Sequence, residues 1–272
     1  MDFAKFTDVN ELAKMVNISN LAEIPMLPEL AEKFEVSLEV ALCAALSTLS
    51  ITFLVSLFLL KAAFGGSAGD TIVFLGLCGA GKTSLFSQLR DGSMHNGTVT
   101  SMEPNDDRFA LFSERKSGRK ARPVRFVDLP GHPRLRAKVD EFLPQARGIV
   151  FVIDALDFQL RPTAEFLYEM LTKKIVVSSR MPILIACNKL DNVSAHSVEF
   201  IRRQLEKEIE KLRVTRTSLS DGDASSTEVR LGKEGEVFKF TQVKNKVTFA
   251  GIIVANNDIQ EVERFVRERV RG

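Results

Sequence analysis

Thr71-Ile-Val-Phe-Leu-Gly-Leu-Cys-Gly-Ala-Gly-Lys-Thr83 is the stretch of this sequence that decides the fold. Its apolar half, Ile72 to Leu75, has the composition of a strand that is buried on both faces. A glycine-rich half follows, and it leads into residues 84–90, where apolar side chains recur at helical spacing. The order of elements here is therefore a strand, a tight turn and a helix.

The turn contains Gly76-x-x-x-x-Gly81-Lys82-Thr83, and this pattern between a strand and a helix is typical of a phosphate-binding loop. Backbone N–H groups of such a turn converge on phosphate oxygens. We expect the Lys82 ammonium to contact the outer phosphates and the Thr83 hydroxyl to bind Mg²⁺. The alternative is a glycine-rich turn that binds nothing, and the flanking strand and helix argue against it. The predicted binding residues are Gly76, Leu77, Cys78, Gly79, Ala80, Gly81, Lys82, Thr83 and Ser84.

A second candidate stretch runs from Val124 to His132 and reads as a strand that ends in Asp128-Leu-Pro-Gly131-His132. A carboxylate at this place, Asp128, suits a magnesium site, where it would act through the metal's water. The Gly131 N–H can bind a γ-phosphate only when one is present, which would make the turn a switch. His132 would then orient an attacking water, so it is the candidate catalytic residue. An isolated Asp-x-x-Gly is usually only a turn, and its weight here comes from its place after the phosphate loop.

A third candidate stretch, Pro182 to Asp191, reads as a strand that ends in Asn188-Lys189-Leu190-Asp191. The Asp191 carboxylate can accept two hydrogen bonds from the N1 and N2 donors of guanine, and adenine lacks that pair. The Lys189 stem can cover the face of the base, and Asn188 can tie this loop to the phosphate loop. All three motifs follow strands, and doubly wound sheets bind ligands at the carboxyl ends of their strands.

The remaining pattern from Thr71 onward alternates strands with helices, which predicts an α/β fold with a doubly wound, mostly parallel sheet and helices on both faces. Between the first helix and the second motif lie a long polar loop, a strand and a basic turn. Near the end we expect a flexible loop, because residues 213–235 are polar and lack periodicity. The predicted strands are 72–75, 108–114, 123–128, 148–154, 182–191, 236–240 and 246–254, and the predicted helices are 84–90, 162–177, 197–211 and 259–270.

The N-terminal part of the chain differs from the rest. Residues 1–60 hold three lysines and eight carboxylates, a net charge of −5, which leaves +7 for residues 61–272 from the chain total of +2. Val40 to Leu60 is uncharged over 21 residues, long enough to cross a bilayer as a helix. The alternative is a buried helix of a soluble protein, but no globular sequence surrounds it. The positive-inside rule places the basic C-terminal side in the cytosol.

The predicted organisation is therefore a lumenal acidic segment at 1–39, a transmembrane helix at 40–60, a hinge at 61–70 and a cytosolic domain at 71–272. Three cysteines without metal-ligand spacing exclude a disulfide framework and suit a reducing cytosol. The mild positive charge of the domain, without a basic and aromatic patch, argues against direct nucleic-acid binding.

Together, Gly76–Thr83, Asp128–His132 and Asn188–Asp191 resemble the motif set of the Ras-like small GTPases. With the N-terminal span, the sequence Asp-Leu-Pro-Gly-His and the long loop before the last strands, the chain closely resembles the β subunits of the signal recognition particle receptor, distant relatives of the vesicle-coat GTPases. This resemblance implies GTP or GDP with Mg²⁺ as ligands, a single-pass place in the endoplasmic reticulum membrane, and the N-terminal domain of the receptor α subunit as partner. It leaves contact with the ribosome or the translocon open.

Carried over residue by residue, the resemblance makes Thr98 or Thr100 the switch threonine that binds the metal, without choosing between them. Two positions depart from the pattern. Ile252-Ile-Val-Ala-Asn256 stands where many members have Ser-Ala-Lys for contact with the base. Cys78 stands where fast Ras-type enzymes have glycine, so its side chain would crowd an incoming arginine finger and hydrolysis should be slow. The alternatives are a vesicle-coat GTPase, which detaches from membranes, and a scaffold that binds no nucleotide.

Overall fold

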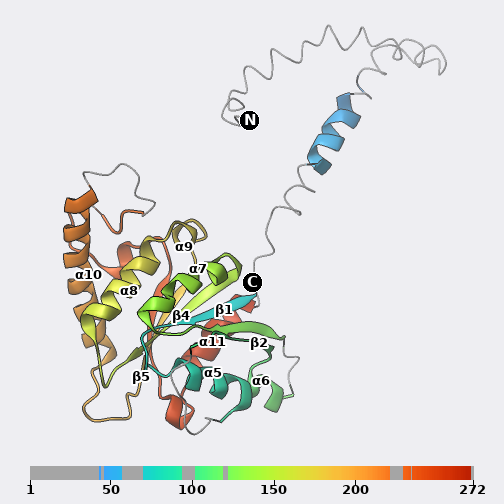
Figure 1. Cartoon of the computed structure of the whole chain (residues 1–272). Coiled ribbons are helices and arrows are strands. Elements are labelled where there is room, and N and C mark those ends of the chain that lie inside the picture. Colours follow the sequence, from blue (N-terminus) through green and yellow to red (C-terminus); the bar gives the residue numbers. More distant parts are fainter. Residues whose placement is uncertain are drawn as a thin grey trace, which may run out of the picture. The chain divides into compact units, whose positions relative to one another are not determined.

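The computed structural model describes residues 43, 46–56, 70–93, 102–118, 122–220, 229–233 and 235–270. The chain divides into two units, Met1–Ser67 and Ala68–Gly272 (Figure 1). In the first unit, residues 46–56 form an exposed helix in which the Ser50 and Thr52 hydroxyls donate to carbonyls of the preceding turn, at 3.3 and 2.9 Å. Across the described ranges, no helix has the length and apolarity needed to cross a membrane. Residues 40–42, 44–45 and 57–60 of the predicted span lie outside those ranges.

The second unit is built on a six-stranded sheet in the order β2-β3-β1-β4-β5-β6. Neighbouring strands are parallel except β2 and β3, so the predicted α/β class with a mostly parallel sheet is confirmed. The central strands are buried because helices cover both of their faces. The strands are β1 (Thr71–Leu75), β2 (Asn105–Phe109), β3 (Val124–Asp128), β4 (Ala146–Asp154), β5 (Ile183–Asn188) and β6 (Val247–Gly251).

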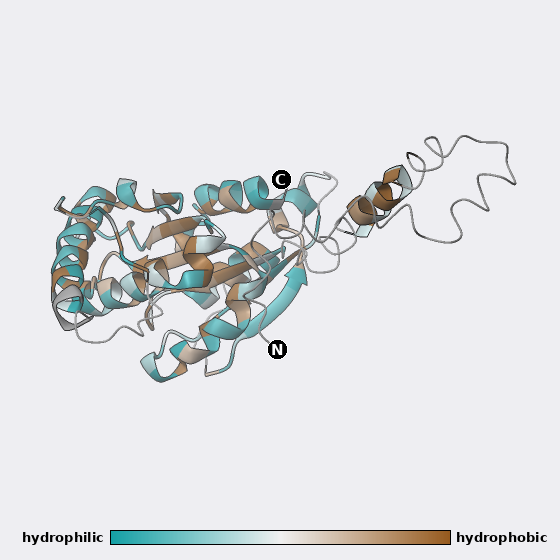
Figure 2. Cartoon of the chain, turned by 90° about the horizontal axis from the view of Figure 1, so that it is seen from above, coloured by the Kyte–Doolittle hydropathy of each residue, from teal (hydrophilic) through white to brown (hydrophobic). Residues whose placement is uncertain are grey.

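The helices supply two hydrophobic cores, one on each face of the sheet. The first core includes Phe166, Leu167 and Ile201, and the second includes Leu85, Phe86 and Val262. Figure 2 shows apolar residues gathered in the central strands, while the outer faces of the helices and the edge strand are hydrophilic. The helices are α5 (Lys82–Asp91), α6 (Phe112–Lys116), α7 (Val139–Phe142), α8 (Leu160–Thr172), α9 (Lys174–Ser178), α10 (Val198–Ser220) and α11 (Gln260–Val270), and the 3-10 turns are η2 (Pro133–Lys138), η3 (Leu143–Gln145), η4 (Phe240–Gln242) and η5 (Val254–Asn256).

The predicted strand 108–114 is wrong. β2 ends at Phe109, and α6 takes up Phe112 to Lys116, including the start of the predicted basic turn. The strand instead begins earlier, in polar sequence, because β2 is an edge strand whose charged side chains find partners on neighbouring elements. Asp106 accepts from the Arg125 Nε at 2.8 Å, for example. Residues 119 and 120, the end of the predicted turn, lie outside the described part.

Four other element boundaries differ from the prediction. The helix predicted at 162–177 breaks at Lys173, whose ammonium lies 2.8 Å from an Asp140 oxygen, and resumes as α9. α10 continues to Ser220 through the start of the predicted flexible loop. The strand predicted at 236–240 is irregular backbone, in which the Phe238 and Phe240 N–H groups donate to carboxylates of α10 at 2.8 and 3.1 Å. The last predicted strand ends at Gly251 and is followed by η5.

We predict that Phe126→Ala destabilises the second unit by about 3–5 kcal/mol, the range for truncating a buried aromatic side chain. Phe126 is fully buried and stacks on Phe109 and Phe74, with ring centroids at 4.4 and 5.9 Å. Chemical denaturation of both proteins gives the difference in the free energy of unfolding. The matched control is Phe200→Ala, since 36% of Phe200 is exposed. An equal loss in the two variants would contradict the stacking argument.

Candidate functional site

The loop between β1 and α5 has the backbone that a phosphate site requires. Gly76, Gly79 and Gly81 have φ angles of 136°, 78° and 92°, a region that residues with a Cβ rarely adopt. A Cβ at Gly76 would lie 2.1 Å from the Val152 carbonyl oxygen of β4, so the loop is also pressed against the sheet. Only glycine fits there without moving the strand.

Lys82, the first residue of α5, is buried and folds back over this loop. Its ammonium donates to the carbonyl oxygens of Gly76 and Leu77 at 3.0 and 2.9 Å. Burial lowers the pKa of Lys82, and the Asp128 carboxylate partly opposes that shift. The loop therefore holds one positive charge within its own curve, beside the N-terminus of a helix, and this arrangement favours an anion.

Thr83 and Asp128 form the second polar group of the site. The Thr83 hydroxyl donates to Asp128 Oδ2 at 2.6 Å, and Asn105 Nδ2 donates to the same oxygen at 3.0 Å. Asp128 is 1% exposed, and its other oxygen, Oδ1, is buried without a hydrogen-bond partner. Burial raises the pKa of Asp128, although the hydrogen bonds from Thr83 and Asn105 oppose the rise. A hydroxyl beside a carboxylate with one unpaired oxygen fits a hydrated Mg²⁺, which prefers such oxygen ligands.

Gly131 packs directly on the phosphate loop. A Cβ there would lie 2.5 Å from the Cys78 nitrogen and 2.7 Å from the Gly76 oxygen, so the two backbones are in contact. The next residue, His132, caps η2, and its Nδ1 accepts from the Arg134 N–H at 3.2 Å. His132 thus lies in the turn as predicted, with one ring nitrogen used by the backbone.

Asn188, at the end of β5, is buried and joins three loops. Its Nδ2 donates to the Ala80 carbonyl at 3.0 Å, and its Oδ1 accepts from the Val254 N–H at 3.2 Å. The first bond reaches the phosphate loop and the second reaches η5. The predicted tie between Asn188 and the phosphate loop is therefore present in the structure.

Lys189 and Asp191 lie at the other end of the site. The Lys189 ammonium pairs with Asp154, and the Asp154 carboxylate also accepts from the N–H groups of Leu156 and Asp157 at 2.9 and 3.0 Å. The ammonium is thereby anchored, which leaves the Lys189 stem beside the cavity. Asp191 is exposed, and its carboxylate is free to accept hydrogen bonds from a ligand at the rim.

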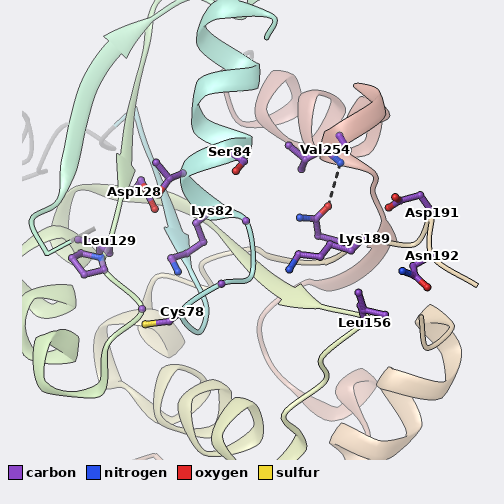
Figure 3. Close-up of a pocket in the computed structure, with 17 residues that line it drawn as sticks. Cys78, Lys82, Ser84, Asp128, Leu129, Leu156, Lys189, Asp191, Asn192 and Val254 are labelled. Carbon is purple, nitrogen blue, oxygen red and sulfur yellow. Dashed lines mark hydrogen bonds between the residues drawn. The ribbon is translucent and has the colours of Figure 1, made fainter. Parts of the chain in front are cut away.

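These residues enclose a cavity of about 470 Å³. Figure 3 shows Lys82, Cys78 and Asp128 at one end, and Lys189, Asp191 and Asn192 at the other. Of the predicted residues, those that line the cavity are Cys78, Gly79, Gly81, Lys82, Thr83, Ser84, Asp128, Gly131, Asn188, Lys189 and Asp191. Gly76, Leu77, Ala80 and His132 are not part of its lining, and Thr98 and Thr100 lie outside the described residues.

The sequence argument missed several residues that the fold brings to this cavity, namely Leu129, Pro130, Leu156, Asn192, Val254 and Ala255. Val254 and Ala255 occupy the place where the Ser-Ala-Lys contact was in question, so the cavity meets η5 there. The sequence argument also missed Asp154, which pairs with Lys189, and Asn105, which donates to Asp128. One signal was available for Asp154, because it ends a buried strand at the same sheet edge as the three motifs.

The fold and the motifs that meet in one cavity define a protein of the small-GTPase class. Comparison with known sequences narrows this class, since residues 67–247 match the family described as the signal recognition particle receptor beta subunit. The chain belongs to that family. Among its relatives, the signal recognition particle receptor subunit beta of Mus musculus is 37% identical over 212 residues, which cover 74% of this chain and 77% of the mouse protein.

Solved structures agree with this placement. The structure of the mammalian SRP receptor matches with a TM-score of 0.63 and 36% identity, and the match covers 73% of this chain and 99% of that one. The SRb-GTP/SRX complex from Chaetomium thermophilum matches with a TM-score of 0.58 over 73% of this chain and 99% of that one. At 23% identity it supports the fold alone. The Chaetomium protein has also been solved as SRb-GDP and as SRb-GDP-Mg.

We predict that Asp128→Asn stabilises the nucleotide-free protein at neutral pH. Because burial raises the folded-state pKa of Asp128, the folded state binds its proton more tightly than the unfolded state. The stabilisation from that proton is complete below the unfolded pKa of about 3.9 and is lost as the pH rises through the folded pKa. The variant should therefore be more stable than the parent at pH 7, and the two curves should converge below about pH 4.

Denaturant unfolding at a series of pH values, with nucleotide and Mg²⁺ removed, measures this difference. The control is Glu103→Gln, which neutralises an exposed carboxylate and should change the free energy of unfolding little at any pH. If Asp128→Asn were less stable than the parent protein at pH 7, the buried charge of Asp128 would not be destabilising as argued.

Proposed function

We propose that this chain is the GTP-binding subunit of a signal recognition particle receptor, acting in the targeting of proteins to the endoplasmic reticulum. Membership of the family supports a role in signal-recognition-particle-dependent targeting. We infer a guanine nucleotide as the ligand because one cavity is lined by the phosphate loop, by Thr83 and Asp128, and by residues of Asn188-Lys189-Leu190-Asp191. Its two ends suit the two ends of a guanine nucleotide.

Within this proposal, each residue acts on a defined part of the nucleotide. The Lys82 ammonium transfers its hydrogen bonds from the loop carbonyls to phosphate oxygens, and the Asp191 carboxylate accepts from the guanine N1 and N2 groups. Thr83 would bind Mg²⁺ through its hydroxyl, and Asp128 would accept from the metal's water. When bound, Mg²⁺ neutralises charge on the outer phosphates. The Chaetomium relative has been solved as SRb-GDP-Mg, and we propose the same ligands for this chain.

We further propose that the turn at Asp128–His132, with the threonine from Thr98 or Thr100, shapes the face that binds the N-terminal domain of the receptor α subunit. A relative from Chaetomium thermophilum has been solved as an SRb-GTP/SRX complex, and we carry its GTP-bound, docked form over to this chain as part of the proposal. The span at 40–60 would hold the chain in the endoplasmic reticulum membrane as a single pass, with residues 1–39 lumenal and 71–272 cytosolic.

The direct test of this proposal uses the full chain expressed in cells and extracted with detergent. Co-purification of the α subunit in the presence of GTP, and its loss after nucleotide removal, is the expected result. Resistance of the chain to alkaline extraction before detergent is added separates a membrane span from the detachable helix of a vesicle-coat GTPase. The proposal would be overturned if the purified chain contained no guanine nucleotide and if ATP competed for its binding site as well as GTP does.

We predict that Asp191→Asn weakens GDP binding by at least about 100-fold, because two hydrogen bonds to a charged acceptor are lost. Xanthine carries a carbonyl oxygen where guanine has its 2-amino group, so the asparagine amide can donate to it. Affinity for XDP should therefore rise in the same variant. Titration with fluorescent GDP and XDP measures both constants. Asp140→Asn, on α7 away from the cavity, is the matched control, and an unchanged preference for GDP in Asp191→Asn would rule out the assigned role.

We also predict slow hydrolysis of bound GTP without a partner. Cys78 is exposed and lines the phosphate end of the cavity, and a side chain at this position would crowd the approach of an arginine finger. His132 has Nδ1 engaged and lies outside the cavity lining. Single-turnover measurement with the nucleotide-loaded chain should give a rate comparable to, or below, the intrinsic Ras rate of about 10⁻⁴ s⁻¹. Rapid turnover by the chain alone would contradict this.

A further inference from the structure

A cluster of four cations lies where the parallel strands of the sheet begin, at the end opposite the nucleotide cavity. We call it the basic edge, and its members are Lys174, Arg180, Lys244 and Lys246, all exposed. Lys174 begins α9, Arg180 precedes β5, and Lys244 and Lys246 precede β6. None of these residues contributes to the cavity or to the motifs described above.

A buried asparagine brings these segments together. Asn245 is 3% exposed, and its Nδ2 donates to the carbonyl oxygens of Val176 and Met181 at 2.8 and 2.9 Å. Each of the four cations lies within two residues, along the sequence, of Asn245, Val176 or Met181. The basic edge is therefore formed by two chain segments, more than 60 residues apart in sequence, whose backbones these bonds hold together.

The cations of the basic edge have no counter-ions among the described residues. Lys246 shares a hollow with Glu261 and Glu268, whose carboxylates pair with Arg264 and Arg269. On the other side, Asp140 and Glu169 pair with Lys173. Neighbouring positive charges without partners repel one another, and an anionic surface outside the chain would relieve that repulsion.

The position of the basic edge indicates which surface that is. The register pairs Thr71 with Ala146 and Ile183 with Val247, so the first residues of the parallel strands share one edge. Asp70, where the described domain begins, is therefore at the same edge as the cluster. With strands about 4.8 Å apart, the start of β1 is only about 15 Å from the start of β6.

Chain length limits the distance from this edge to the predicted span. Residues 61–69 join Asp70 to the end of the span, and at most about 3.5 Å per residue they reach about 30 Å. If residues 40–60 span a bilayer, this chain length keeps Asp70 within about 30 Å of the membrane. An exposed apolar side chain, Ile175, lies in α9 beside Lys174, and the cluster contains no aromatic residue. Sites for single-stranded nucleic acid combine cations with aromatic residues on which the bases stack, and this cluster offers no such residue.

We propose that the basic edge binds the anionic headgroups of the membrane that carries the chain and thereby orients the domain. The inference rests on the proposed membrane span. Attraction between a basic surface and anionic lipid acts within about one Debye length, roughly 8 Å in physiological salt. Contact at this edge turns the carboxyl ends of the strands, and with them the nucleotide cavity, away from the bilayer and toward the cytosol. Each neutralised cation should reduce the contact equilibrium about fivefold.

The test uses the full chain in nanodiscs of phosphatidylcholine alone or with about one-third phosphatidylserine. A water-soluble amine-acylating reagent, read by mass spectrometry, gives the reaction rates of Lys174 and Lys244. Both should react several-fold more slowly in the anionic nanodiscs, and high salt should remove the difference. Lys207, exposed on α10, is the internal reference and should react equally in both.

The variant Arg180→Gln/Lys246→Gln keeps both reporter lysines and should abolish most of their protection, by about 25-fold in the contact equilibrium. The matched control is Arg161→Gln/Arg203→Gln, which removes two exposed charges from α8 and α10 and should leave protection intact. Equal acylation in the two nanodiscs, or equal effects of the two double variants, would overturn the inference alone. Failure of the chain to enter either nanodisc would overturn both the inference and the proposed span.

Discussion

One buried amide underlies the arrangement of the site. Asn188 has both ends of its side chain bonded, to the phosphate loop after β1 and to η5 after β6. These loops come from opposite sides of β4 and β5 in the sheet, and their chain segments lie far apart in sequence. Because a buried amide must keep its partners, the distance between the phosphate end and the base end of the cavity is fixed by this side chain. A substitution that cannot bond in both directions leaves a buried backbone group unsatisfied.

Around that fixed frame, the cavity holds charges that folding alone would not favour. Burial lowers the pKa of Lys82 and raises that of Asp128, which means that both charged forms cost free energy in the folded chain. The Asp128 Oδ1 atom also remains unpaired. Groups of this kind are expected where a protein is prepared to bind a charged ligand, because the ligand supplies the missing partners. The surrounding aromatic and aliphatic cores supply the stability that offsets these costs.

Much of this could be predicted from the sequence because the information is local. Each motif follows a buried strand, and parallel strands bring their carboxyl ends to one edge, so Lys82, Asp128, Asn188 and Asp191 had to converge. What could not be predicted depends on contacts distant in sequence. The irregular backbone at Phe238 and Phe240 follows from Glu210 and Glu206 on α10, and the polar strand β2 follows from its pairing with β3. The lining by Val254 and Ala255 depends likewise on where β6 ends.

The contact of Gly131 with the phosphate loop has a mechanical consequence. The two backbones touch without an intervening side chain, so an atom that enters between them must push the glycine outward. His132 follows at once and caps a turn that begins with Pro133, a residue whose ring fixes its own backbone angle. The 3-10 turn η2 and the helix α7 follow directly along the chain, so an outward shift of Gly131 would be passed to them through the backbone.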